Sequence, residues 1–412
     1  MDFEFSAEER AFEAEVEAFL AAERSADVMD AHPEQLSQTV DTPPKRAFMK
    51  KLSERGWLGM SWPKQYGGRE LPGIYDFLLT EALSRAGAPQ PGKGVGIVGK
   101  TIIRHGNERL KREFLPKIIA GEIEFAIGYS EPGAGSDAAN MQLRAVRDDA
   151  RGSKEADGNV GRRAVSEGER SSSGWVLSGQ KTWTTSAHFA DWYWVGARTD
   201  PASKHKGITL FLIPMDHPGL TIRPTWTIGD ERTNEVFFDD VFVPDDHVVG
   251  QVNGGWTYIC EALDLERFAM MPVGPLEKKV EAVCEWVRTA RRDGEPVRRD
   301  PRARRTVAQL VTQLEVARML QRRVISQAVK GGVPTVESSQ YKLYMNECSK
   351  RTANAALDLM GAAGQAKPGA DGAPAGGRFE RSYRYTVVDT IGGGTSEIQK
   401  NIIARRKLGL PT

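Results

Sequence analysis

The hydrophobic periodicity of this 412-residue chain changes twice, and those changes constrain the fold more than any single motif. Residues 6–122 repeat apolar side chains at helical spacing. Residues 123–247 hold short β-branched and aromatic runs separated by turn residues. The helical period returns over residues 248–412. This order lacks βαβ alternation, and no GxGxxG follows a strand, so we expect an α+β fold, mostly α, without a Rossmann nucleotide site.

Local signals divide these three parts further. Ser6 and Glu9 are spaced as a capping box at the start of a first helix. Residues 144–173 are charged and rich in Gly and Ser, which predicts a long surface loop inserted in the middle domain. That loop would stay flexible unless a partner orders it, and a regulatory role is open. Further helices are predicted at 75–85, 107–119, 338–360 and 396–406, with a Gly/Ala/Pro-rich connector at 364–378.

The composition excludes several classes of protein. A formal net charge of +1 argues against binding nucleic acid through bulk electrostatics. The acidic, amphipathic start of the chain does not resemble a signal peptide, and no apolar run approaches the roughly 18 residues of a membrane span. We therefore expect a cytoplasmic enzyme with no membrane partner. The three cysteines lack metal-ligand spacing and are interpreted as reduced structural thiols: Cys260, Cys284 and Cys348.

Two segments between residues 125 and 199 have the composition of a binding site. The first, FAIGYSEPGAGSD at 125–137, is an apolar run that breaks into a Pro/Gly turn, where bare backbone N–H groups can approach a ligand. The second places Trp183 beside Thr184 and Thr185, between two predicted strands. A flat aromatic side chain next to hydroxyls suits a flat polar ring system. Together the segments indicate a flavin site.

Four motifs then resemble the acyl-CoA dehydrogenase family, in family order and over nearly the whole chain: YSEPGAGSD, GQKTWTTSA, FDDVFVP…GQVNGGW and GGGTSEIQKNIIAR. The resemblance implies an N-terminal helical domain at 1–122, a middle β-barrel-like domain at 123–247 and a C-terminal four-helix bundle at 248–412. It also implies non-covalent FAD where the middle and C-terminal domains meet. The FAD-contacting positions that it implies are Tyr129, Ser130, Ser136, Trp183, Thr185, Thr395 and Glu397.

The resemblance implies α,β-dehydrogenation of an acyl thioester, in which a carboxylate removes the α-proton and a hydride passes to the flavin. Many family members carry that carboxylate in a Tyr-Glu-Gly-Thr turn, where this chain has Gly393. Isovaleryl- and long-chain-type members carry it on a helix at the start of the bundle, and Glu266 falls on that position. We therefore assign Glu266 as the base and Gly393 as a backbone donor to the thioester oxygen. A solvated Glu-Arg pair on a surface helix is the alternative interpretation of Glu266 and Arg267.

The remaining site assignments concern the substrate. Ser136 and Asp264 would lie along the pantetheine of acyl-CoA, and Arg267 would have a positional role there. The missing side chain at Gly393 favours a branched or bulky acyl group. An electron-transfer flavoprotein is the expected acceptor. His105 and His188 fit no catalytic pattern and are interpreted as structural.

One segment departs from the family pattern. The family supplies an Arg and a Phe from a neighbouring subunit to FAD, but residues 287–305 lack the Phe and carry eight arginines instead. Either this segment is a solvated basic loop, or one arginine such as Arg291 still contacts a phosphate across an interface. Asp358 replaces a Gln that contacts FAD in the family. A homodimer or homotetramer is expected, and a heteromer with a FAD-poor subunit stays open. So does an enzyme of this fold, dehydrogenase or oxidase, that acts on a carrier-protein thioester or another non-CoA substrate.

Overall fold

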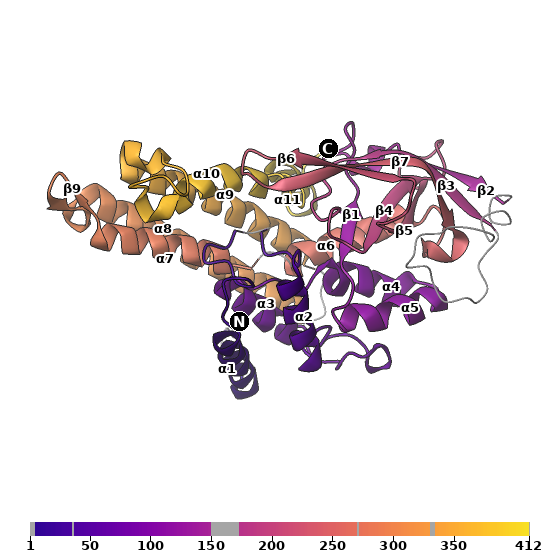
Figure 1. Cartoon of the computed structure of the whole chain (residues 1–412), viewed down its shortest axis with the longest axis horizontal. Helices are drawn as coiled ribbons and strands as arrows, with labels where there is room; N and C mark the ends of the chain where they lie inside the picture. The colour runs from indigo at the N-terminus through magenta and orange to yellow at the C-terminus, as the bar shows by residue number, and fades with distance from the viewer. Residues whose placement is uncertain (1–4, 35–36, 150–172, 270–271, 330–333, 412) are drawn as a thin grey trace.

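The computed structural model describes residues 5–34, 37–149, 173–269, 272–329 and 334–411. The side chains of residues 264–269 and 328–329 also lie outside that description. Three groups of elements follow one another along the chain, and the mostly helical α+β fold that the sequence predicts is confirmed. Figure 1 shows the sheet at one end of the molecule, the long bundle helices at the other, and α6 (Gly255–Ala269) where they meet the N-terminal helices.

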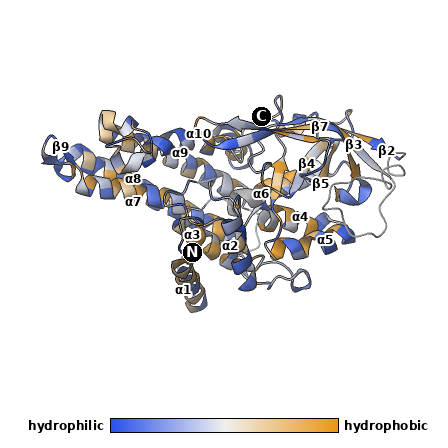
Figure 2. Cartoon of the chain, viewed as in Figure 1, coloured by the Kyte–Doolittle hydropathy of each residue, from blue (hydrophilic) through white to orange (hydrophobic). Residues whose placement is uncertain are grey.

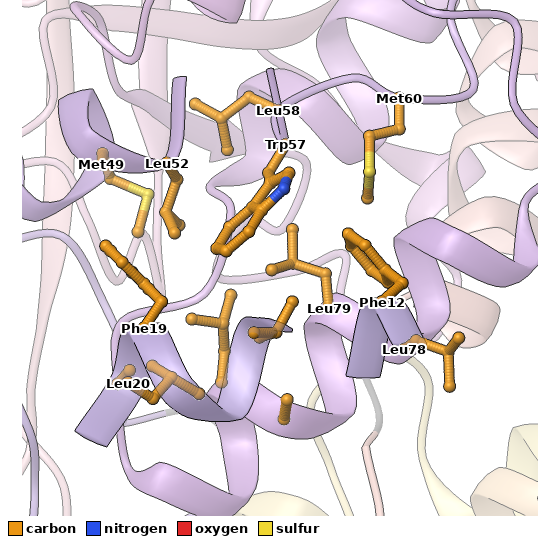
Figure 3. Packing of buried hydrophobic residues seen from close by; sticks show 14 of the residues in the cluster. Phe12, Phe19, Leu20, Met49, Leu52, Trp57, Leu58, Met60, Leu78 and Leu79 are labelled. Atoms are coloured by element: carbon orange, nitrogen blue, oxygen red, sulfur yellow. The ribbon is translucent and has the colours of Figure 1, made fainter. Parts of the chain in front are cut away.

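The first three helices of the N-terminal part pack around one aromatic centre, whereas its last two share a second cluster with residues of the sheet. Phe12 and Phe19 both meet the ring of Trp57 edge-on, with centroids 5.8 and 5.2 Å apart (Figure 3). The predicted capping box is confirmed, because the Ser6 hydroxyl accepts from the Glu9 N–H while the Glu9 carboxylate accepts from the Ser6 N–H. The helices of this part are α1 (Ala7–Ala22), α2 (Pro43–Glu54), α3 (Ile74–Ala86), α4 (Gly99–His105) and α5 (Glu108–Ile119), with a π-helix η2 (Gly94–Val98) before α4.

The middle part is a sheet of eight strands within the described residues. Its order is β6-β7-β3-β2-β4-β5-β8, and β1 pairs in parallel with β4. β4 is buried along its whole length, which explains its unbroken apolar run WYWVGA. The strands are β1 (Phe125–Gly128), β2 (Arg144–Asp148), β3 (Gly174–Lys181), β4 (Trp192–Arg198), β5 (Ile208–Pro214), β6 (Leu220–Trp226), β7 (Arg232–Pro244) and β8 (Val248–Val249).

The structure corrects one boundary in this part. The predicted loop at 144–173 does not begin at Arg144, because β2 occupies the first five of its residues and pairs antiparallel with β3. The side chain of Ala145 is buried in the sheet although its neighbours are exposed. A single buried position in a charged segment is too weak a signal for sequence periodicity to detect. Residues 150–172 of the predicted loop lie outside the described residues.

The C-terminal helices form the predicted four-helix bundle, whose amphipathic helices carry both hydrophobic and hydrophilic residues (Figure 2). Two helices of this part, α7 and α10, were not predicted. In α10 the sequence RFERSYRYTVVD interrupts the apolar side chains with arginines. A small hairpin lies at the far end of the bundle (Figure 1). The elements are α7 (Gly274–Thr289), β9 (Arg291–Arg292), β10 (Glu295–Pro296), α8 (Pro301–Val329), α9 (Thr335–Met360), α10 (Arg378–Asp389) and α11 (Ser396–Arg406).

Candidate active site

The segment after β1 and the segment after β3 lie side by side. The N–H of Thr182 donates to the carbonyl of Ser130 at 2.9 Å. The ammonium of Lys181 donates to the Glu131 carboxylate at 2.7 Å and to the Tyr129 carbonyl at 3.2 Å. The two segments that the sequence singled out are therefore joined at the sheet edge, and Tyr129 and Ser130 remain partly exposed there.

Glu131 is a structural residue of this site. Its carboxylate accepts from the backbone N–H groups of Gln142 and Leu143, at 2.5 and 2.8 Å, in addition to Lys181. Burial lowers the pKa of Lys181 to about 8, and the adjacent Glu131 carboxylate acts in the opposite direction. Because this buried carboxylate already accepts three hydrogen bonds, we interpret it as structural and not as a base toward substrate.

Trp183 has an exposed ring on a strained backbone. Its φ is +59°, in the left-handed region that costs a non-glycine residue about 1 kcal/mol or more, and its side chain is 59% exposed. Thr185 is exposed as well, whereas Thr184 is buried with its hydroxyl 2.9 Å from the Tyr193 hydroxyl. A large ring held outward at a conformational cost is typical of a ligand contact.

Asn234 on β7 fixes this turn from behind. Its buried amide donates to the Thr184 carbonyl at 2.8 Å and lies 3.0 Å from His188 Nδ1, while the Thr184 N–H donates to the Asn234 carbonyl. Burial lowers the pKa of His188, and the nearby Arg232 guanidinium lowers it further. A histidine held in this way supports the turn, in agreement with its structural interpretation.

The glycine turn before α11 forms the second half of the site. Gly393 and Gly394 have φ of +65° and +93°, a conformation that glycine adopts without strain. The amide of Gln399 donates to their two carbonyls, at 3.4 and 3.1 Å. Thr395 caps α11 by accepting from the Ile398 N–H at 3.2 Å. The turn is therefore rigid, and position 393 contributes no side chain to it.

Glu397 lies in the exposed first turn of α11. Hydrogen bonds from its own backbone N–H and from Thr395 lower the pKa of its carboxyl. An ionised carboxylate here suits the hydroxyls of a ribose better than the oxygens of a phosphate.

The hairpin between β6 and β7 connects the two halves. Arg384 on α10 donates to the Ile228 carbonyl at 2.8 Å and pairs with Asp230 at 2.5 Å. The same guanidinium is held by Glu380 at 2.6 Å. β7 carries Asn234, which holds the Trp183 turn, and α10 leads into the turn at Gly393. The two halves of the site therefore meet at one junction between sheet and bundle.

Helix α6 supplies the remaining predicted residues. Its backbone includes Asp264, Glu266 and Arg267, whose side chains lie outside the described residues. The helix packs against α9, on which α11 also packs, and against β5 and η2. Position 266 is therefore carried by an element that adjoins both the sheet and the bundle.

Ser136 is exposed on the loop after β1, next to the pair that Asp137 forms with Lys204 at 2.7 Å. A cavity of about 260 Å³ opens beside this loop. Its lining residues are Glu131, Pro132, Gly133, Asn140, Gln142, Leu143, Gly179 and Gln180.

Several side chains that the sequence raised as alternatives have structural partners. His105 stacks on Tyr258 with centroids 4.3 Å apart and contacts Glu261 at 2.9 Å. Arg291 donates to the carbonyl of Gly294 within the β9–β10 hairpin, so a contact with a phosphate stays a prediction. None of Cys260, Cys284 and Cys348 forms a disulfide. No cluster of metal-ligating side chains occurs among the described residues, and no described helix has both the length and the apolar character needed to cross a membrane.

The arrangement fits FAD on two observations. An exposed, strained aromatic ring with two hydroxyl-bearing neighbours, Ser130 and Thr185, can contact an isoalloxazine, and the capped N-terminus of α11 presents polar groups at the same junction. The carboxylate of Glu131 is already bonded to Lys181 and to two backbone N–H groups, and Gly393 supplies no side chain. The assignment of the base to Glu266 on α6 stays a prediction.

Comparisons with known proteins agree along the whole chain. The acyl-CoA dehydrogenase N-terminal, middle and C-terminal domains match residues 6–122, 126–241 and 253–408. The chain is 31% identical to the acyl-CoA dehydrogenase FadE26 of Mycobacterium tuberculosis over 374 residues, 89% of this chain and 88% of that one. Its fold superposes on the Tcur3481-Tcur3483 steroid ACAD with a TM-score of 0.84 at 32% identity, and on the ChsE4-ChsE5 complex of Mycobacterium tuberculosis with 0.84 at 28%, each covering both chains fully. The chain therefore belongs to the acyl-CoA dehydrogenase family and is an FAD-dependent oxidoreductase of acyl-CoA.

Proposed function

We propose that this enzyme converts a bulky or branched acyl-CoA to its trans-2-enoyl-CoA, with the base on α6 and the flavin against the Trp183 turn. One observation supports this arrangement most. The junction carries an exposed Trp183 on a strained backbone, and the glycine turn at 393–394 offers no carboxylate. The site then needs its base from elsewhere, and α6 adjoins both halves.

FAD would be held by Tyr129, Ser130 and Ser136 after β1, by Trp183 and Thr185 after β3, and by Thr395 and Glu397 at α11. When bound, FAD supplies the two-electron acceptor for the hydride that leaves the β-carbon. The protein's task is to exclude water around that ring and to hold its polar edge, which the hydroxyls of Ser130 and Thr185 suit.

Glu266 would remove the α-proton. A carboxylate performs this step best when an apolar, closed site raises its pKa toward neutrality. The thioester oxygen, which becomes more negative as the proton leaves, would accept from the Gly393 N–H. A side chain at 393 would occupy the space into which the base must reach.

The substrate would enter along Ser136 and Asp264, with Arg267 holding the helix in place. A related solved structure at 32% identity is described as a steroid ACAD, which supports a bulky ring-containing acyl group for this chain as well. The partners that we propose are an electron-transfer flavoprotein and a second subunit. Two related structures are each named by a pair of different proteins, which supports a heteromer, and a homodimer or homotetramer is the alternative.

Anaerobic bleaching of the bound flavin by a panel of acyl-CoAs tests this proposal. Glu266→Gln should bind FAD as the wild type does and lose bleaching by about 10² to 10⁴-fold, because only the proton-transfer step is removed. Glu261→Gln on the same helix is the matched control, since that side chain contacts His105. Full bleaching by Glu266→Gln would remove the base assignment, and bleaching only by short straight-chain substrates would remove the substrate class.

A further inference from the structure

The Trp183 turn is also held by the N-terminal helical part. The ammonium of Lys93 donates to the hydroxyl of Ser186 at 2.9 Å. Ser186 is 4% exposed and lies three residues after Trp183. A charge-assisted hydrogen bond to a buried hydroxyl is among the stronger polar contacts in proteins. This one joins two segments that are 93 residues apart.

A second cation strengthens the same connection. Arg46 on α2 donates to the carbonyl of Phe189 at 2.6 Å and to the carboxylate of Asp191 at 2.8 Å. That carboxylate also accepts from the Glu124 N–H at 2.9 Å. The segment 186–191 is therefore clamped between cations of the N-terminal part and the start of β1.

Glu124 completes this charged cluster. Burial raises the pKa of its carboxyl to about 7, and the cations Arg46 and Lys93 act in the opposite direction. The backbone approaches the carboxylate closely, because a Cβ at Gly92 would lie 2.3 Å from its Oε2. Packing against Glu124 therefore fixes the backbone at Gly92, and this also fixes the position of the Lys93 backbone that follows it.

Lys93 also directly precedes an unusual element. Residues Gly94–Val98 form the π-helix η2, a rare conformation that is frequent at functional sites. η2 packs against α6, where Val98 shares a buried cluster with Tyr258 and Ile259. Lys93, which bonds to the Trp183 turn, is thus followed directly by η2, and η2 packs against α6, the helix of the proposed base.

We propose that Lys93 is a positioning residue for the flavin-facing turn: through Ser186 it keeps Trp183 in its strained outward conformation, and through η2 it links that turn to α6. This inference rests on the proposed contact between the flavin ring and Trp183. The turn has backbone bonds at Thr182 and Thr184 on one side. On the C-terminal side of Trp183, the bond from Lys93 to the Ser186 hydroxyl holds the turn. Without this bond, the backbone at Trp183 could relax from its strained conformation.

The test compares Lys93→Met, which keeps the length of the side chain without its charge, with Lys93→Arg and Ser186→Ala. FAD is removed from each protein, and FAD affinity is then measured by quenching of tryptophan fluorescence, together with the absorption spectrum of the bound flavin. Lys93→Met and Ser186→Ala should each weaken FAD binding about tenfold, the loss expected for one charge-assisted hydrogen bond. Lys93→Arg should restore most of the affinity. The double variant should be no weaker than either single variant, because both remove one bond.

Two controls separate this inference from a general loss of stability and from the proposed function. Lys100→Met, on the following helix α4, should leave FAD affinity unchanged, and urea unfolding of the FAD-free proteins reports stability separately. The inference is wrong if Lys93→Met lowers stability while affinity and spectrum stay as in the wild type, or if the two single effects add in the double variant. If Trp183→Phe leaves affinity and spectrum unchanged, the placement of the flavin fails instead, whatever Lys93 does.

Discussion

Trp183 carries an exposed ring on a backbone conformation that an ordinary residue adopts only at a cost. The sequence identified the residue, because an aromatic beside two threonines suits a flat ring, but it gave no sign of the positive φ. Glu131 lies in the Pro/Gly turn at 125–137 that the sequence singled out. Only the structure shows that Lys181 and two backbone N–H groups use that carboxylate.

Replacing Trp183 by Gly should have opposite effects on stability and on binding. Glycine relieves the left-handed backbone strain, so the FAD-free protein should gain about 1 kcal/mol in free energy of unfolding. Loss of the ring should weaken FAD binding roughly five- to tenfold. Urea unfolding and FAD titration measure the two effects. Ala375→Gly, at another exposed position with positive φ, should gain stability without changing affinity; a loss of stability in Trp183→Gly would contradict the strain.

Asp389 provides a pH-dependent prediction at the same scale. Its side chain is 2% exposed, and burial raises its pKa from 3.8 to about 7, with Lys279 acting in the opposite direction. The folded chain therefore holds a proton that the unfolded chain has lost between these values, and the stabilisation from this group disappears as the pH rises toward 7. The difference in free energy of unfolding between Asp389→Asn and the wild type should therefore shift in favour of the variant by on the order of 2 kcal/mol from pH 5 to pH 8.

Urea unfolding at both pH values measures that difference. Asp371→Asn, on the exposed connector, should show the same stability relative to wild type at pH 5 and pH 8. An advantage of Asp389→Asn that does not grow with pH would show that the carboxyl stays ionised throughout.

At the scale of elements, strong periodicity was a reliable guide and weak periodicity was not. The helix predicted at 396–406 is α11, and the capping box at Ser6 starts α1 as expected. α10 and β2 were missed for a shared reason: arginines interrupt their apolar pattern, and each is stabilised by contacts with another element, α9 and β3 respectively. The contacts that stabilise them are tertiary, so no local signal reports them.

Arg384 tests how the β6–β7 hairpin is attached to α10. Its guanidinium bonds Glu380, Asp230 and the Ile228 carbonyl, and its side chain is only 13% exposed. Arg384→Met should cost about 3 kcal/mol in free energy of unfolding, because it leaves the Glu380 carboxylate, whose side chain is only 10% exposed, without its cation. Arg299→Met, which removes an exposed pair with Glu295, should cost less than about 1 kcal/mol. Equal losses in the two variants would mean that Arg384 is merely a surface charge.

At the scale of the molecule, the candidate site lies at the junction of sheet and bundle, and Figure 1 shows the N-terminal helices below that junction. FAD that binds there should stabilise the whole fold, since it contacts both parts only when they are assembled. At 100 times its dissociation constant, FAD should add about 2.7 kcal/mol to the free energy of unfolding. Thermal unfolding of FAD-depleted protein at increasing FAD concentration measures this. The shift should be smaller in Trp183→Phe, and an unfolding temperature that is independent of FAD would exclude binding at the junction.

The sequence by itself determined the family and the order of helices and sheet, and it predicted the residues of the flavin site, because periodicity and motifs are local properties of the chain. Only the tertiary structure decided which of these residues are free to meet a ligand. In the folded chain Glu131 is bonded to Lys181, and the ring of Trp183 is exposed. Lys93 of the N-terminal part contacts Ser186 of the middle part. Such contacts join residues far apart in the chain, and their strength comes from burial, which exists only once the chain has packed.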